Sequence, residues 1–209
     1  MVDAVFGAEG ALARALPGYE VRAGQLEMAR AVEEAIARKR HLAVEAPCGI
    51  GKTFAYLVPA IRHALATDSR VIVCTANIAL QEQIVSKDLP ALQSLLGTPF
   101  SYALIKGINN YFCRDRYEEA SREIPTLTFD REELHDFRRI GAWSQETRSG
   151  DLSDLDFEPR DGVWARVNGV SELCNGAQCR FYEDCFAMEA RRRVRAAQVV
   201  VTNYHLFFA

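Results

Sequence analysis

The sequence lacks both a strong charge of one sign and a long hydrophobic run. Its 209 residues carry 25 Lys and Arg against 28 Asp and Glu, a formal net charge of −3. This balance offers no overall attraction to nucleic acid, so any DNA contact must come from a local basic patch. No stretch approaches the roughly 18 consecutive apolar residues of a membrane span, and no signal-peptide pattern opens the chain. We therefore expect a soluble, cytoplasmic protein without a membrane partner.

An export signal is missing as well, which makes a disulfide framework a weak explanation of the cysteines in a chain of this length. The six cysteines are Cys48, Cys74, Cys113, Cys174, Cys179 and Cys185. The last three fall in the pattern C-x4-C-x5-C, and Cys113 precedes them as a solitary fourth. Four thiolates suit zinc or a [4Fe–4S] cluster equally well by count, and the solitary member favours the iron–sulfur cluster.

Short apolar runs alternate with amphipathic segments through the first half of the sequence. The spacing predicts helices at 25–39, 52–66 and 77–86. Buried strands are predicted at 41–45, 70–74, 101–105 and 198–202. Strands that alternate with helices in this way are typical of βαβ units, so we expect an α/β fold with a parallel sheet.

The pattern changes after Gly107. Residues 108–195 are rich in charge, show no buried-strand signal and hold the cysteine trio. Within them, 130–145 is predicted to be helical and 148–162 to be an acidic loop. We expect 1–107 to form the first part of a nucleotide-binding domain, 108–195 a small and mostly helical insertion, and 196–209 a return to the sheet.

The segment from Ala46 to Thr53 has the form of a phosphate-binding loop. It follows a predicted strand and opens a predicted helix, and it contains Gly49, Ile50, Gly51, Lys52 and Thr53. The glycines allow backbone N–H groups to point at phosphates, and the start of the helix adds its positive dipole end. Lys52 is expected to reach the β- and γ-phosphates of ATP, and the Thr53 hydroxyl to bind Mg²⁺.

Three further segments carry polar or charged side chains that fit either a binding role or an ordinary structural role. Gln25 opens the first helix and can pair with an adenine edge through its amide, although it is also an ordinary helix-start residue. The segment from Thr75 to Gln83 can place helix-start N–H groups on a nucleic-acid phosphate, although an N-cap by Thr75 or Asn77 explains it equally well. The run 191–195 (RRRVR) is either a basic stripe for DNA or a solvated helix face.

Taken together, these segments resemble a known family. EAPCGIGKT (45–53), VIVCTANIALQEQI (71–84), KGINNYFC (106–113), the cysteine trio and AQVVVTNYHLFF (197–208) occur in the order found in the N-terminal part of DinG-type helicases. These are relatives of XPD that contain an iron–sulfur cluster. The resemblance covers nearly the whole chain.

The resemblance implies an ATP-driven helicase that moves 5′ to 3′ on single-stranded DNA, with a RecA-like domain interrupted by an iron–sulfur domain. Arg22 and Gln25 then read the adenine, and residues 49–53 hold the phosphates. The implied ligands of the [4Fe–4S] cluster are Cys113, Cys174, Cys179 and Cys185. Thr75 and Gln81 are the implied contacts to single-stranded DNA.

The sequence contains no Asp-Glu-Ala-His box, which in such enzymes supplies a carboxylate to Mg²⁺ and orients the attacking water. We therefore expect a truncated, monomeric piece of a helicase that binds ATP-Mg but neither hydrolyses it efficiently nor unwinds DNA alone. Two alternatives stand beside this hypothesis. One is a non-catalytic nucleotide- and DNA-binding module with a redox-sensitive cluster, and the other is an ATP-binding zinc protein.

Overall fold

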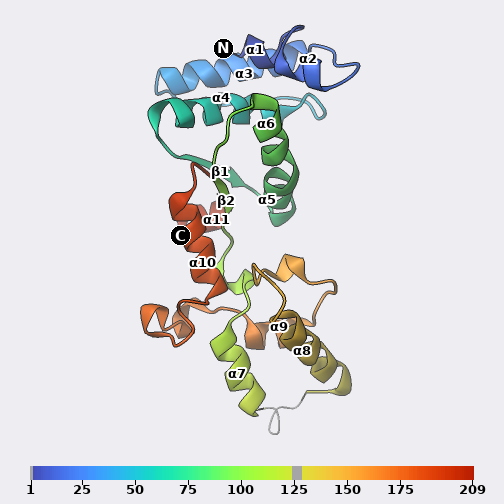
Figure 1. Cartoon of the computed structure of the whole chain (residues 1–209), viewed down its shortest axis with the longest axis vertical. Helices are drawn as coiled ribbons and strands as arrows, with labels where there is room; N and C mark the ends of the chain where they lie inside the picture. The colour runs from blue at the N-terminus through green and yellow to red at the C-terminus, as the bar shows by residue number, and fades with distance from the viewer. Residues whose placement is uncertain (1, 124–128) are drawn as a thin grey trace. The chain divides into compact units, whose positions relative to one another are not determined.

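The computed structural model describes residues 2–123 and 129–209 and divides the chain into two compact units. The first unit runs through residue 104 and resumes at residues 196–209, and the second unit comprises residues 105–195. Figure 1 shows the order of their helices and strands along the chain.

The first unit is built on a three-stranded parallel sheet. Its strands are β1 (Val71–Thr75), β2 (Tyr102–Leu104) and β3 (Val199–Asn203), and their order across the sheet is β1-β3-β2. In the register, Val199 lies opposite both Val71 and Tyr102. The central strand β3 is buried over its first four residues, as expected for a continuous apolar run between two neighbours. The predicted strands at 70–74, 101–105 and 198–202 and the parallel α/β architecture are confirmed.

Helices flank this sheet (Figure 1). They are α1 (Asp3–Phe6), α2 (Ala11–Ala15), α3 (Ala23–Ala37), α4 (Lys52–Thr67), α5 (Ile78–Gln83), α6 (Leu89–Leu96) and α11 (Tyr204–Phe208). Among them, α4, α5 and α11 are in contact with the strands, and the other helices of the unit pack mainly on helices. The predicted helices at 25–39 and 52–66 correspond to α3 and α4, which pack against each other. The predicted helix 77–86 is only partly correct, because α5 gives way to one turn of π-helix, η1 (Ile84–Asp88), before α6 begins.

The predicted strand at 41–45 is wrong. Residues 41–45 are exposed and belong to no strand, and the apolar side chains of Leu42 and Val44 are both more than 40% exposed. A strand requires hydrogen bonds to a neighbouring strand. Within the described residues no strand pairs with this segment, so its apolar composition alone does not make it one.

The second unit consists of helices around a separate aromatic core. Its longer elements are α7 (Arg114–Glu123), α8 (Arg131–Trp143), α9 (Asp161–Val167) and α10 (Phe186–Ala196). Short 3₁₀ turns connect them: η2 (Ile108–Asn110), η3 (Leu152–Asp154), η4 (Ser171–Leu173) and η5 (Gly176–Gln178). The predicted helix 130–145 matches α8, whose N-terminus carries a capping box formed by Asp130 and Glu133.

Extended pairing in the second unit is limited to two isolated bridges in the part of the chain that the structure describes. Tyr111 pairs with Asp151 and Phe112 pairs with Asn168, both antiparallel. Phe112 then packs among aromatic side chains of the core, including Tyr117, Trp143 and Phe186. The segment 111–113 is thus held between two distant parts of the chain.

Over residues 2–123 and 129–209, no helix has the length and apolar character needed to cross a bilayer.

Candidate functional site

The predicted phosphate-binding loop joins an extended segment to α4. Gly49 has φ +83° and Gly51 has φ +87°, a left-handed region that side chains rarely adopt. Gly51 is also the N-cap of α4, so the loop ends where the free N–H groups of the first helical turn begin. This is the local geometry in which a helix start receives a phosphate.

The Lys52 amine is folded back onto the loop. Its Nζ donates to the carbonyl oxygens of Ala46 at 3.0 Å and Pro47 at 2.9 Å. The positive charge therefore lies inside the turn that a phosphate would enter. Thr53 follows directly in the first turn of α4 and shares a hydrogen bond with Tyr56, whose pKa is raised above its usual value mainly by burial.

Helix α3 contacts the same loop through both residues assigned to adenine. Arg22 Nη1 donates to the Gly49 carbonyl at 2.6 Å, and Gln25 Nε2 donates to the Gly51 carbonyl at 3.0 Å. Gln25 is buried. The structure thus brings the predicted adenine and phosphate residues together, although their roles toward a nucleotide stay predictions.

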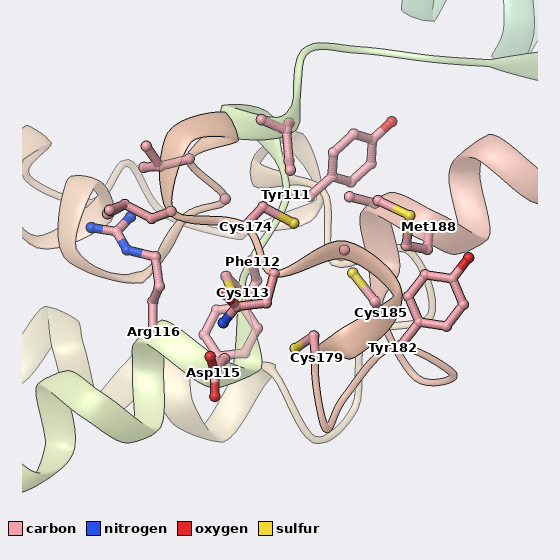
Figure 2. A pocket seen from close by; sticks show the side chains of 17 residues that line it. Tyr111, Phe112, Cys113, Asp115, Arg116, Cys174, Cys179, Tyr182, Cys185 and Met188 are labelled. Carbon is pink, nitrogen blue, oxygen red and sulfur yellow. The ribbon is translucent and has the colours of Figure 1, made fainter.

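The four cysteines that the sequence singled out line a single cavity in the second unit (Figure 2). The cavity has a volume of about 50 Å³, above the roughly 10–15 Å³ that one buried water requires, and Tyr111, Phe112 and Tyr182 are among the other residues that line it. The lining thiols belong to Cys113, Cys174, Cys179 and Cys185. All six cysteines of the chain are free thiols, and the remaining two, Cys48 and Cys74, lie in the first unit.

Cys113 lies immediately before the first turn of α7. Burial raises the pKa of its thiol, while hydrogen bonds from the backbone amides of Arg116 and Asp115 act in the opposite direction. These amides belong to the helix start and favour a negatively charged sulfur. Burial is the larger effect, so the neutral thiol is favoured here until a metal ion binds the sulfur.

Ion pairs attach the cysteine-bearing loop to α7. Arg180, which follows Cys179, contacts the carboxylates of Asp115 at 2.9 Å and Glu118 at 3.0 Å. On the other side of the loop, Arg192 Nη2 donates to the carbonyl of Glu183 at 2.8 Å. These contacts orient the loop toward Cys113.

The four thiols form a donor set that suits either zinc or a [4Fe–4S] cluster by count, and the identity of the metal stays a prediction. All four potential donors are soft sulfurs that line the same cavity. In residues 2–123 and 129–209, no three His, Cys, Asp or Glu side chains lie close enough together to hold one metal ion.

The two residues assigned to DNA are both buried in the first unit. Thr75 ends β1, and its hydroxyl donates to the carbonyl of Asn77 at 2.9 Å, while the Asn77 side chain caps α5 by accepting from the Leu80 N–H. Gln81 is completely buried, and its amide atoms have no hydrogen-bond partner among the described residues. A DNA contact by Gln81 stays a prediction, and it requires the side chain to become exposed.

The second unit contains an arginine-lined pocket, of which the sequence indicated the charge but not the location. Arg191, Arg192 and Arg195 project from α10 into a cavity of about 340 Å³ whose wall includes Ser171 and Cys174. The run RRRVR signalled the charge, but only the fold places these side chains beside the cysteine-bearing loop. We call this cavity the arginine pocket.

Comparison with known proteins identifies the family of this chain. Residues 26–148, more than half of the chain, match the model of the DEAD/DEAH box helicase family. The chain is 39% identical over 208 residues to "ATP-dependent DNA helicase YoaA" of Escherichia coli K12, covering 98% of this chain and 31% of that protein. It is 40% identical over 215 residues to "ATP-dependent helicase DinG" of Mycobacterium tuberculosis H37Rv, covering 94% and 32%.

A third relative carries another name. "3'-5' exonuclease DinG" of Bacillus subtilis 168 is 34% identical over 206 residues, which cover 96% of this chain and 21% of that protein. The chain thus spans about a third or less of the length of these curated relatives. The resemblance to DinG-type helicases is confirmed, and the chain belongs to the DEAD/DEAH box helicase family.

Proposed function

We propose that this chain is the nucleotide-binding, iron–sulfur portion of an ATP-dependent DNA helicase that moves 5′ to 3′ on single-stranded DNA in the cytoplasm. The observation that carries the proposal is the combination of two sites in one chain. A loop with the phosphate-binding sequence pattern precedes α4, and Cys113 shares one cavity with three cysteines more than sixty residues later. The family match and the relatives named as helicases agree with it.

In the first unit, a RecA-like nucleotide site would use the loop and α3. ATP would lie with its phosphates on the N–H groups of residues 49–53, with Lys52 released from its carbonyl contacts to pair with the β- and γ-phosphates. Thr53 would bind Mg²⁺, and Arg22 and Gln25 would hold the adenine. Because the sequence has no Asp-Glu-Ala-His box, we propose that the isolated chain binds ATP-Mg without efficient hydrolysis.

In the second unit, the four cavity cysteines would hold a [4Fe–4S] cluster. Such a cluster, when bound, cross-links the segments that supply its thiolates and can exchange an electron. The chain's own contribution is to deliver thiolates to one cavity, aided by the helix-start amides at Cys113. Arg180 keeps Cys179 near α7 through its pairs with Asp115 and Glu118.

The arginine pocket supports the DNA part of the proposal. Arg191, Arg192 and Arg195 line it, and guanidinium groups pair with phosphate oxygens without regard to base sequence. Arg192 already contacts Glu189 and the Glu183 carbonyl, so Arg191 is the first candidate for a phosphate contact. The chain as a whole carries a net negative charge, so a local site of this kind is what binding to a polyanion requires. Thr75 and Gln81 remain the candidates in the first unit.

The direct test combines nucleotide and DNA binding in the anaerobically purified chain. A fluorescent ATP analogue with Mg²⁺ should bind, and a labelled oligothymidine should bind with an affinity that falls as salt rises. The chain alone should neither turn over ATP at the rate of a complete helicase nor unwind a duplex. Absence of nucleotide binding would overturn the assignment of the first unit, and helicase-like turnover would contradict the proposed incompleteness.

A further inference from the structure

Lys106 forms a buried ion pair that the proposed chemistry does not use. Its side chain is 2% exposed, and its Nζ lies 2.8 Å from each carboxylate oxygen of Asp151. The hydroxyl of Ser153 lies 2.9 Å from the same nitrogen. Lys is almost never buried unless it is paired, and each charge of a buried pair depends on the other. We therefore expect the Lys106–Asp151 pair to hold the two segments that carry it in one arrangement.

The ion pair lies at the start of the segment that ends in Cys113. The backbone N–H of Lys106 donates to the Tyr111 hydroxyl at 3.2 Å, and Tyr111 forms the isolated bridge with Asp151. Lys106 and Asp151 are thus joined twice, once through their side chains and once through Tyr111. The segment 106–113 cannot shift along its partner without breaking both connections.

The other end of the segment is fixed by backbone hydrogen bonds. The Phe112 N–H donates to the Gly150 carbonyl at 2.8 Å, and the Cys113 N–H donates to the Val167 carbonyl at 2.7 Å. Gly150 has φ +63°, and a Cβ atom added there would lie 2.2 Å from the Phe186 ring, so the turn requires glycine. Because Phe112 is hydrogen-bonded to Gly150 and directly precedes Cys113, a displacement of residues 150–151 would be transmitted to Cys113 through Phe112.

The partner segment has its own anchor on the same carboxylate. Asp151 Oδ1 accepts from the Ser153 N–H at 3.0 Å and from the Ser153 hydroxyl at 2.9 Å, and thereby caps η3. One carboxylate thus binds Lys106 and also shapes the turn against which Phe112 pairs. Removing the lysine leaves this carboxylate buried with an uncompensated charge, which favours reorganisation of the turn.

We propose that Lys106 is a positioning residue for the metal centre: its ion pair with Asp151 fixes segment 106–113 and thereby sets the place of the Cys113 thiol in the cavity. The inference rests on the proposed [4Fe–4S] cluster. It also assigns distinct tasks within KGINNYFC, with Lys106 and Tyr111 fixing the segment and Cys113 supplying the donor.

The test compares Lys106→Met, Asp151→Asn and their double variant with Lys87→Met, which removes an exposed lysine of the first unit. Iron per chain, the rate at which a chelator bleaches the visible absorption, and the electron paramagnetic resonance spectrum of the reduced cluster are measured. Each single variant should lose its cluster at least about tenfold faster, and the double variant should be no worse than either single, because the two residues act as one unit. Lys87→Met should match the parent chain.

Positioning and mere stabilisation give different spectra. A displaced Cys113 thiolate should alter the resonance spectrum of the clusters that remain, whereas a loss of folded chains lowers only their yield. If the Lys106→Met protein folds too poorly, Ser153→Ala removes one contact of the ammonium and should accelerate bleaching by a few-fold. A parent chain with iron, together with unchanged bleaching and spectra in the variants, would overturn this inference alone. A parent chain without iron would overturn the proposed cluster as well.

Discussion

The side-chain amide of Gln25 donates to the carbonyl oxygen of Gly51 at 3.0 Å, and a Cβ atom at Gly51 would lie 2.1 Å from that same amide nitrogen. The bond connects α3 to the predicted phosphate-binding loop at Gly51, the N-cap of α4. Gly51 therefore meets two requirements together, a positive φ and a close approach by Gln25.

Gly51→Ala should abolish binding of a fluorescent ATP analogue. The new methyl group would displace Gln25, and the left-handed conformation would cost about 1–2 kcal/mol in addition. Gly18→Ala is the matched control, because Gly18 also has a positive φ, +77°, but a Cβ atom added there would have no other atom within 4 Å. If both variants bind the analogue equally well, the Gln25–Gly51 contact has no part in the nucleotide site.

Lys52→Ala should weaken nucleotide binding at least about tenfold while leaving the melting temperature of the first unit nearly unchanged. A charge-assisted hydrogen bond to a phosphate contributes about 1.5–3 kcal/mol, whereas the two carbonyls that Lys52 now contacts lie in a partly exposed loop. Equilibrium titration with the fluorescent analogue measures the effect, and Lys87→Ala serves as the control. An unchanged affinity would show that Lys52 does not meet the phosphates.

Tyr111 should make the stability of the second unit depend on pH in the alkaline range. Burial raises the pKa of its phenol from 10.0 to about 12. The folded state therefore keeps the proton over a range in which the unfolded state has lost it. The resulting stabilisation, about 2–3 kcal/mol, is fully present below pH 10 and is lost as the pH rises toward 12.

Denaturant unfolding between pH 9 and pH 12, followed by near-ultraviolet circular dichroism, measures this loss. Tyr111→Phe should reduce the slope over that interval, because the titrating phenol is gone. It should also be less stable at neutral pH, since the Lys106 N–H loses the hydroxyl as its acceptor. An unchanged alkaline slope in the variant would assign the dependence to other groups.

Arg191→Ala should weaken binding of oligothymidine and of other base sequences to a similar extent. Because Arg191 lines the arginine pocket, we expect it to contact a phosphate, and its loss should lower the slope of log affinity against log salt by about 0.7. Arg38→Ala in the first unit is the matched control, since Arg38 is an exposed arginine that pairs with Glu34 outside the arginine pocket. Equal slopes for the parent chain and Arg191→Ala would remove the arginine pocket from the DNA interface.

The sequence pattern was sufficient to predict the longest helices and the strands of the first unit and helix α8 of the second. Helices α3 and α4 follow from apolar spacing, α8 also carries a capping box, and the three paired strands follow from continuous apolar runs. The segment 41–45 also contains a short apolar run, yet it has no strand partner among the described residues. Strand pairing is a tertiary event that apolar composition alone does not determine.

The candidate site residues likewise differ in whether they are contiguous in sequence or brought together by the fold. The loop at residues 49–53 is contiguous, so its glycines and Lys52 were readable directly from the sequence. That Cys113 shares a cavity with three cysteines more than sixty residues away came from spacing and resemblance, and the fold supplies the physical reason through the pairing of residues 111–113 with 150–151 and 167–169. Gln81 shows the limit of such reasoning, because the sequence did not reveal that its amide is buried.

The measurement that tests the central claim most directly is anaerobic purification followed by a visible spectrum and analysis of iron, sulfide and zinc. The account predicts brown protein with about four iron and four sulfide per chain, and loss of both in Cys179→Ser. Cys74→Ser, outside the cavity, should keep them. Colourless protein with one zinc per chain and no sulfide would contradict the account and leave an ATP-binding protein with a structural zinc site.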